Sequence, residues 1–67
     1  MAKKLILYWL AMAKTFRLSA LTCATYAKMV ALSDPELAMA FDYEYSVCIA
    51  ECRDCINHAI KIKNGGI

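Results

Sequence analysis

Three cysteines stand close together near the carboxyl end of the chain, in the stretch CIAECRDC. Cys48, Cys52 and Cys55 are spaced four and then three residues apart, and His58 follows three residues after the last of them. On an α-helix, residues at this spacing lie on one face, so four soft ligands gather on one side of a predicted helix. Thiolate and imidazole groups bind Cu(I) and Zn²⁺, which makes soft-metal binding one hypothesis for this stretch.

The same cysteines also suit a structural role. Cysteine is among the most buried residue types and packs like a small apolar side chain. A straight helix does not wrap three of its own side chains around one zinc ion in a tetrahedron. We therefore favour a buried seam and expect no cofactor. The alternative is Cu(I) or Zn binding through Cys48, Cys52, Cys55, His58 and Cys23.

The segment SVCIAECRDCINH resembles part of the C-x3-C-x2-C-x3-C repeat of the cysteine-rich four-helix copper-storage proteins. The fourth cysteine of that repeat falls on Ala59, and the amino-terminal half of the chain contributes only Cys23. The resemblance implies a four-helix arrangement in which Cu(I) is held by the cysteine face.

The segment LSDPEL divides the chain into two helical halves, because no glycine or proline precedes it. Ser33 stands where it would cap a second helix, with Glu36 completing a capping box. Leu32 and Leu37 occupy the positions of a hydrophobic staple, and Pro35 suits the first helical turn. One helix is therefore predicted to end here and another to begin.

The sequence predicts a single all-α domain over residues 1–67, an antiparallel helical hairpin. A first helix is expected at about 3–32, a turn at 33–35, a second helix at about 35–63 and a flexible tail at 64–67. Asn64 and the two glycines after it are a suitable helix stop. Apolar residues recur in both halves at alternating steps of four and three, which predicts one facing stripe on each helix. The predicted core or dimer seam comprises Leu5, Trp9, Met12, Phe16, Cys23, Tyr26, Val30, Phe41, Tyr45, Cys48, Cys52, Cys55 and Ile62.

The composition exceeds what such a hairpin can bury. Apolar residues make up 61% of the chain, whereas about 45–50% is typical even when glycine is counted. Two helices bury one stripe each, so we expect a second hairpin to cover the remainder and form a homodimeric four-helix bundle. This plan is similar to that of the Rop family of plasmid copy-number proteins, hairpins that dimerise and bind RNA.

Charge is divided along the sequence, since the first acidic residue of the chain is Asp34. The basic residues Lys3, Lys14, Arg17 and Lys28 are predicted to gather on the side of the first helix opposite the seam. RNA or an anionic membrane binding this basic face is a second alternative function. A membrane partner is not favoured, because the apolar run at residues 5–13 is much shorter than a bilayer requires.

No catalytic arrangement is visible, because the only histidine has no serine or acid grouped with it in a recognisable pattern. Four cysteines among only two glycines and one proline do not look like a secreted disulfide framework. The favoured hypothesis is a cytoplasmic, non-enzymatic interaction protein that dimerises and then regulates or inhibits a larger protein partner. Accessory proteins of phages and plasmids are often of this kind.

Overall fold

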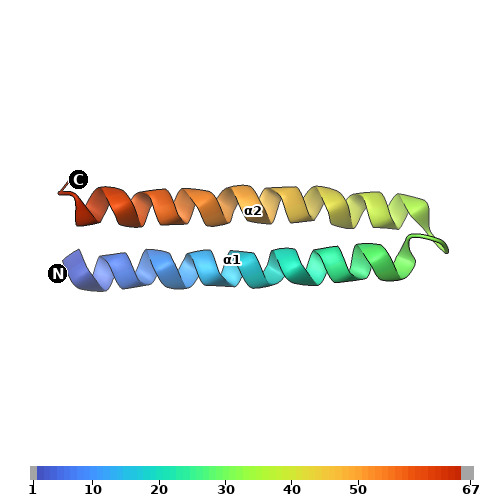
Figure 1. Cartoon of the computed structure of the whole chain (residues 1–67), viewed down its shortest axis with the longest axis horizontal. Helices are drawn as coiled ribbons and strands as arrows, with labels where there is room; N and C mark the ends of the chain where they lie inside the picture. Colours follow the sequence, from blue (N-terminus) through green and yellow to red (C-terminus); the bar gives the residue numbers. More distant parts are fainter. Residues whose placement is uncertain (1, 66–67) are drawn as a thin grey trace.

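The computed structural model describes residues 2–65 and consists of two α-helices, α1 (Ala2–Val30) and α2 (Pro35–Lys63). The helices run antiparallel and side by side, with both ends of the chain at the end remote from the turn (Figure 1). The predicted all-α hairpin is confirmed, with α1 ending two residues before its expected end. Gly66 and Ile67 of the predicted tail lie outside the described residues.

The hairpin is a flat rod with extents of 49 × 15 × 9 Å. Its radius of gyration is 15.2 Å, whereas a globular domain of this length has one of roughly 11 Å. Each helix therefore packs against one neighbour only, and most of its circumference faces outward.

The turn between the helices corrects the predicted capping. Asp34, not Ser33, is the N-cap of α2, and its carboxylate accepts a hydrogen bond from the Leu37 N–H at 3.1 Å. The Ser33 hydroxyl instead donates to the carbonyl of the last α1 residue at 3.4 Å. Leu32 is fully exposed, so the predicted staple with Leu37 does not form. The reason is Pro35, whose fixed φ suits the first helical position and so makes the preceding residue the cap.

The carboxyl end of α2 follows the prediction more closely. Asn64 is the C-cap, and its N–H donates to the Ile60 carbonyl at 3.0 Å. Gly65 adopts a positive φ of 72°, and its N–H donates to the Ile62 carbonyl at 3.0 Å. Glycine takes this left-handed conformation without steric cost, so the predicted helix stop is confirmed. Asn64 and Gly65 thus belong to a hydrogen-bonded turn.

The interface between the helices is built from small side chains. In α1 the buried residues are Ala13, Ala20 and Ala27, which recur every seventh position and so share one line along the helix. The buried residues of α2 are Ala38, Cys48, Cys55, Ala59 and Ile62. No large side chain among the described residues is fully buried. The methyl and thiol groups let the two backbones approach closely, but they bury little apolar surface.

The predicted seam is more accurate on α2, where only Tyr45 is exposed, than on α1, where part of it is displaced. Cys48, Cys55 and Ile62 are buried as expected. The predicted residues that are half-buried are Trp9, Met12, Phe16, Cys23, Val30, Phe41 and Cys52. The predicted residues that are exposed are Leu5, Tyr26 and Tyr45.

The displacement on α1 is by one residue, because Ala13 and Ala27, on one line with Ala20, are buried in place of their neighbours Met12 and Tyr26. The prediction favoured the larger apolar side chain at each step, whereas closely packed helices require the smaller one. Leu5, Tyr26 and Tyr45 are therefore not core residues of the hairpin, and their place in a dimer seam stays a prediction.

Two aromatic contacts fix the register of the helices. Trp9 stacks on His58 with ring centroids 4.6 Å apart, and Tyr26 stacks on Phe41 at 5.5 Å. From the first contact to the second, the residue number on α1 rises by seventeen, from 9 to 26, and that on α2 falls by seventeen, from 58 to 41. The pairing therefore keeps one register along the rod.

Candidate functional site

The four cysteines are free thiols in two environments. Cys48 and Cys55 are buried in the helix interface, whereas Cys23 and Cys52 are half-buried. Burial raises the pKa of the Cys48 thiol, and the adjacent Cys23 thiol of α1 together with nearby carboxylates raises it further. Burial likewise raises the pKa of the Cys55 thiol, assisted by Glu51. Both buried thiols are thus held in the neutral form, which is the less reactive one.

The candidate metal ligands do not converge. Cys48 lies beside Cys23, Cys52 lines a groove on one side of the hairpin, and His58 stacks on Trp9. Across residues 2–65, no three His, Cys, Asp or Glu side chains are grouped so that they could hold a metal ion. The predicted cysteine face instead divides between the helix interface and its two flanks, so the geometry gives the soft-metal alternative no support.

One broad side of the hairpin is hollowed by shallow grooves. One groove, of about 480 Å³, lies near the turn and has a floor of Ala24, Ala27, Ala31 and Ala38. A second groove lies between Leu10 and Ile56 nearer the open end, and a third lies along α2. We call this side the groove face. It is formed by Leu10, Lys14, Arg17, Ala24 and Lys28 of α1, by Ala31 of the turn, and by Asp42, Tyr45, Ser46, Ile49, Arg53 and Ile56 of α2.

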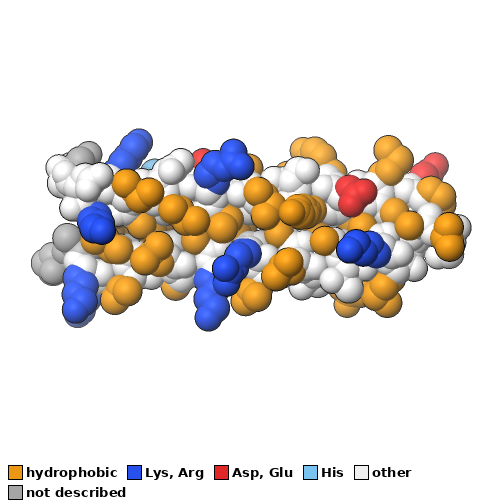
Figure 2. Space-filling view, viewed as in Figure 1, with side chains coloured by type: hydrophobic (Ala, Val, Ile, Leu, Met, Phe, Trp, Pro, Cys, Tyr) orange, Lys and Arg blue, Asp and Glu red, His pale blue; other side chains and the backbone are white. Residues whose placement is uncertain are grey.

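The groove face is strongly basic. Figure 2 shows it as a stripe of apolar side chains with cationic side chains along both edges. Lys14, Arg17 and Lys28 of α1 and Arg53 of α2 line the grooves, and Asp42 is the acid among the lining residues. Seven-residue spacing continues the same lines to Lys3 on α1 and Lys63 on α2.

The predicted basic residues are thus on one side, but they flank the helix interface instead of lying opposite it. Lys14 and Arg17 line a groove together with the buried Ala13 and with Cys52 of the other helix. Sequence reasoning missed Arg53 and Lys63, which join this face only because the hairpin register brings α2 alongside. No spacing between basic residues singles them out, because Arg53 and Lys63 are ten positions apart on α2.

The other broad side carries aromatic and acidic side chains. Tyr26 lies two residues from Ala24, or about 200° around the helix, and stacks on Phe41. Glu44 is two residues from Asp42, so it also lies away from the grooves. Residues at multiples of seven positions from Tyr26 or from Glu44 lie on the same lines along α1 and α2. We call this side the aromatic face; its residues are Leu5, Trp9, Met12, Tyr26, Leu37, Phe41, Glu44, Glu51 and His58.

Three comparisons with known proteins found no match to this chain, whether among protein families, curated proteins or solved structures. The architectural resemblance to the Rop family therefore stays a prediction. Within residues 2–65, neither helix has an apolar stretch long enough to cross a bilayer. Function must be argued from the two faces themselves.

Proposed function

We propose that this chain is a non-enzymatic interaction protein that self-associates through its aromatic face, as a four-helix bundle, and regulates a larger protein partner. One observation carries the proposal. The folded hairpin exposes 5251 Å² of surface, whereas a monomeric globular protein of this mass exposes roughly 4,200 Å². The excess of roughly 1,000 Å² is of the size that a specific protein interface removes from water.

The chemical nature of the exposed surface supports the same proposal. Large apolar side chains lie outward along both helices, including Leu5, Leu21 and Met29 of α1 and Met39 and Ile60 of α2. The hairpin interface holds mainly alanine and cysteine, so folding alone leaves most of the large apolar groups in water. Contiguous exposed apolar surface of this kind typically marks a site of association.

Dimensions favour a face-to-face dimer. The broad side of the rod measures 49 by 15 Å between backbone positions, or roughly 700 Å², close to the ~800 Å² per partner of standard interfaces. The aromatic face is the better side for self-association, because two groove faces in contact would bring the six cations of one copy close to the six cations of the other. Its acids Glu44 and Glu51 both lie on α2, so they can face α1 of the second copy, which has no acid.

The test compares two leucine substitutions within α1. Leu5 lies on the aromatic face and Leu18 lies on the outer edge of α1, and the two side chains are 42% and 51% exposed. Leu5→Glu should weaken the dimer by at least about 100-fold, because a dimer loses two buried leucines worth about 1.5–3 kcal/mol each. Leu18→Glu should leave the dimer within a few-fold of the parent.

The dissociation constants are measured by sedimentation equilibrium over a range of protein concentrations. Circular dichroism confirms that both variants keep their helix content, which separates a loss of association from a loss of folding. Equal dissociation constants for the two variants would contradict the assignment of the dimer to the aromatic face. A parent protein that stays monomeric would contradict self-association altogether.

A further inference from the structure

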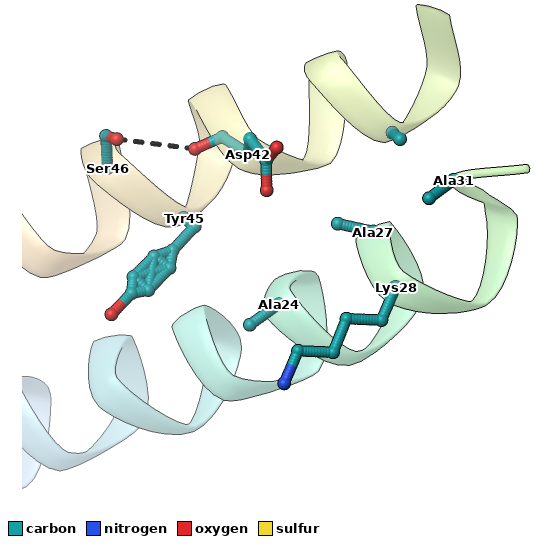
Figure 3. A pocket seen from close by; sticks show the side chains of 8 residues that line it. Ala24, Ala27, Lys28, Ala31, Asp42, Tyr45 and Ser46 are labelled. Atoms are coloured by element: carbon teal, nitrogen blue, oxygen red, sulfur yellow. Dashed lines mark hydrogen bonds between the residues drawn. The ribbon is translucent and has the colours of Figure 1, made fainter. Parts of the chain in front are cut away.

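The groove face has a centre that a helix can enter. Alanines at positions 24, 27, 31 and 38 leave the floor of the groove near the turn without long side chains. Figure 3 shows Tyr45 and Asp42 standing on α2 on one side of this groove, with Lys28 running along α1 on the other. A groove floored by methyl groups accepts the apolar ridge of an amphipathic helix, a common mode of peptide recognition.

The walls of the groove face determine the charge of the occupant. Lys14 and Arg17 stand beside the Leu10 and Ile56 groove, and Arg53 lies beside Ile49. The three grooves together carry Lys14, Arg17 and Lys28 along α1 and Arg53 on α2, against the acid Asp42 beside the alanine floor. This excess of positive charge favours a ligand with anionic side chains flanking its apolar ridge. The occupant that fits both features is an acidic amphipathic helix.

Other occupants fit less well. A second copy of the chain would oppose its own basic groove face, with like charges in contact. A single-stranded nucleic acid needs aromatic platforms for its bases, and Tyr45 is the aromatic residue among the groove linings. A membrane surface needs apolar side chains that project outward, whereas the apolar centre here is recessed between the helices.

We propose that the groove face binds an acidic amphipathic helix of a protein partner, with its apolar ridge over the alanine floor and its carboxylates against the flanking lysines and arginines. This inference rests on the proposed function and adds the face and the chemistry of the partner. It predicts that the partner and the second copy bind opposite sides of the hairpin and do not compete.

The probe is a labelled synthetic helix of roughly 20 residues, with leucines along one line and glutamates on both flanks. A matched peptide replaces every glutamate with lysine. Fluorescence anisotropy with the full chain should show binding of the acidic peptide only, with an affinity that falls as salt screens the charges. Equal binding of the lysine peptide would overturn the proposal.

Two variant pairs locate the site. Lys14→Glu combined with Arg17→Glu should weaken binding at least about 10-fold, whereas Lys4→Glu combined with Lys61→Glu makes the same charge change away from the grooves and should have a much smaller effect. Ala24→Leu fills the groove without altering charge and should also weaken binding about 10-fold. If both groove variants bind the acidic peptide as tightly as the parent does, the proposal is overturned.

The remaining outcomes identify the wrong occupant or separate the two proposals. Vesicles with anionic headgroups, or a single-stranded RNA, that displace the acidic peptide at lower concentration would overturn the assignment to a protein helix. Leu5→Glu should leave peptide binding unchanged, because Leu5 lies on the other face. A monomeric protein that still binds the peptide would refute self-association alone, whereas a dimer that ignores the peptide would refute the groove proposal alone.

Discussion

Enlarging Ala20 should be the most damaging single apolar substitution in the hairpin. Ala20 is 1% exposed, the lowest value in the core, and lies on the alanine line that contacts α2. Leucine would add three carbon atoms where the helices already touch, and such overpacking costs about 1–3 kcal/mol. A domain of this length has a total stability of roughly 3–10 kcal/mol. Ala20→Leu therefore removes a large share of the stability.

The assay is thermal unfolding followed by circular dichroism at a fixed protein concentration. About 2 kcal/mol corresponds to a fall in Tm of roughly 8–16 °C for a domain of this size. Ala11→Leu is the control, because Ala11 is exposed on the outer side of α1 and alanine and leucine have similar helix propensity. An Ala20→Leu protein as stable as the Ala11→Leu protein would refute the close alanine packing, since a looser interface would accept leucine.

Three further predictions concern the helix ends and the buried thiols. Asp34→Ala should cost about 1 kcal/mol in chemical denaturation, because it removes the N-cap hydrogen bond of α2, whereas Ser33→Ala should cost little. Gly65→Ala should cost about 1–2 kcal/mol in the same assay, because a left-handed φ of 72° strains any residue with a Cβ. Raising the pH past about 9 should destabilise the fold, because unfolded thiols then ionise while Cys48 and Cys55, with raised pKa values, keep their protons.

The alkaline effect is isolated by comparing the parent with a Cys48→Ala, Cys55→Ala double variant. The fall in stability between about pH 8 and about pH 10, one unit either side of the ordinary thiol pKa of 9.0, should be smaller in the variant. An identical pH dependence in both proteins would exclude these thiols as its source. For the caps, a larger loss from Ser33→Ala than from Asp34→Ala would restore the capping box that the sequence predicted.

The helices and their ends could be predicted because local chemistry determines them. Pro35 cannot lie inside a helix, and Asn64 with Gly65 forms a natural stop, so both bounds of α2 follow from the residues alone. The choice between Ser33 and Asp34 as cap needed one more step, the recognition that Pro35 takes the first helical position.

The contact line of α1 could not be obtained from size and spacing alone. Both the Ala13, Ala20 and Ala27 line and the neighbouring line through Met12 and Tyr26 satisfy a seven-residue repeat. The distance between the helices decides between them, and that distance depends on the small side chains of α2. A tertiary property therefore selected the line.

The grouping of cations was likewise only half visible in the sequence. Lys14, Arg17 and Lys28 share a side of α1 by helical periodicity. Arg53 of α2 joins them only because of the register between the helices, which the stacking of Trp9 on His58 and the second aromatic contact, of α1 with Phe41, fix. Burial also differs among the cysteines of α2, since Cys48 and Cys55 lie in the helix interface whereas Cys52 lines a groove.

Sedimentation equilibrium of the parent chain at micromolar concentration is the decisive measurement. Self-association predicts a species of twice the 7.5 kDa chain mass that dissociates on dilution. A single species of 7.5 kDa at every concentration would show that the exposed apolar surface is tolerated in water, and the proposed dimer would have to be abandoned.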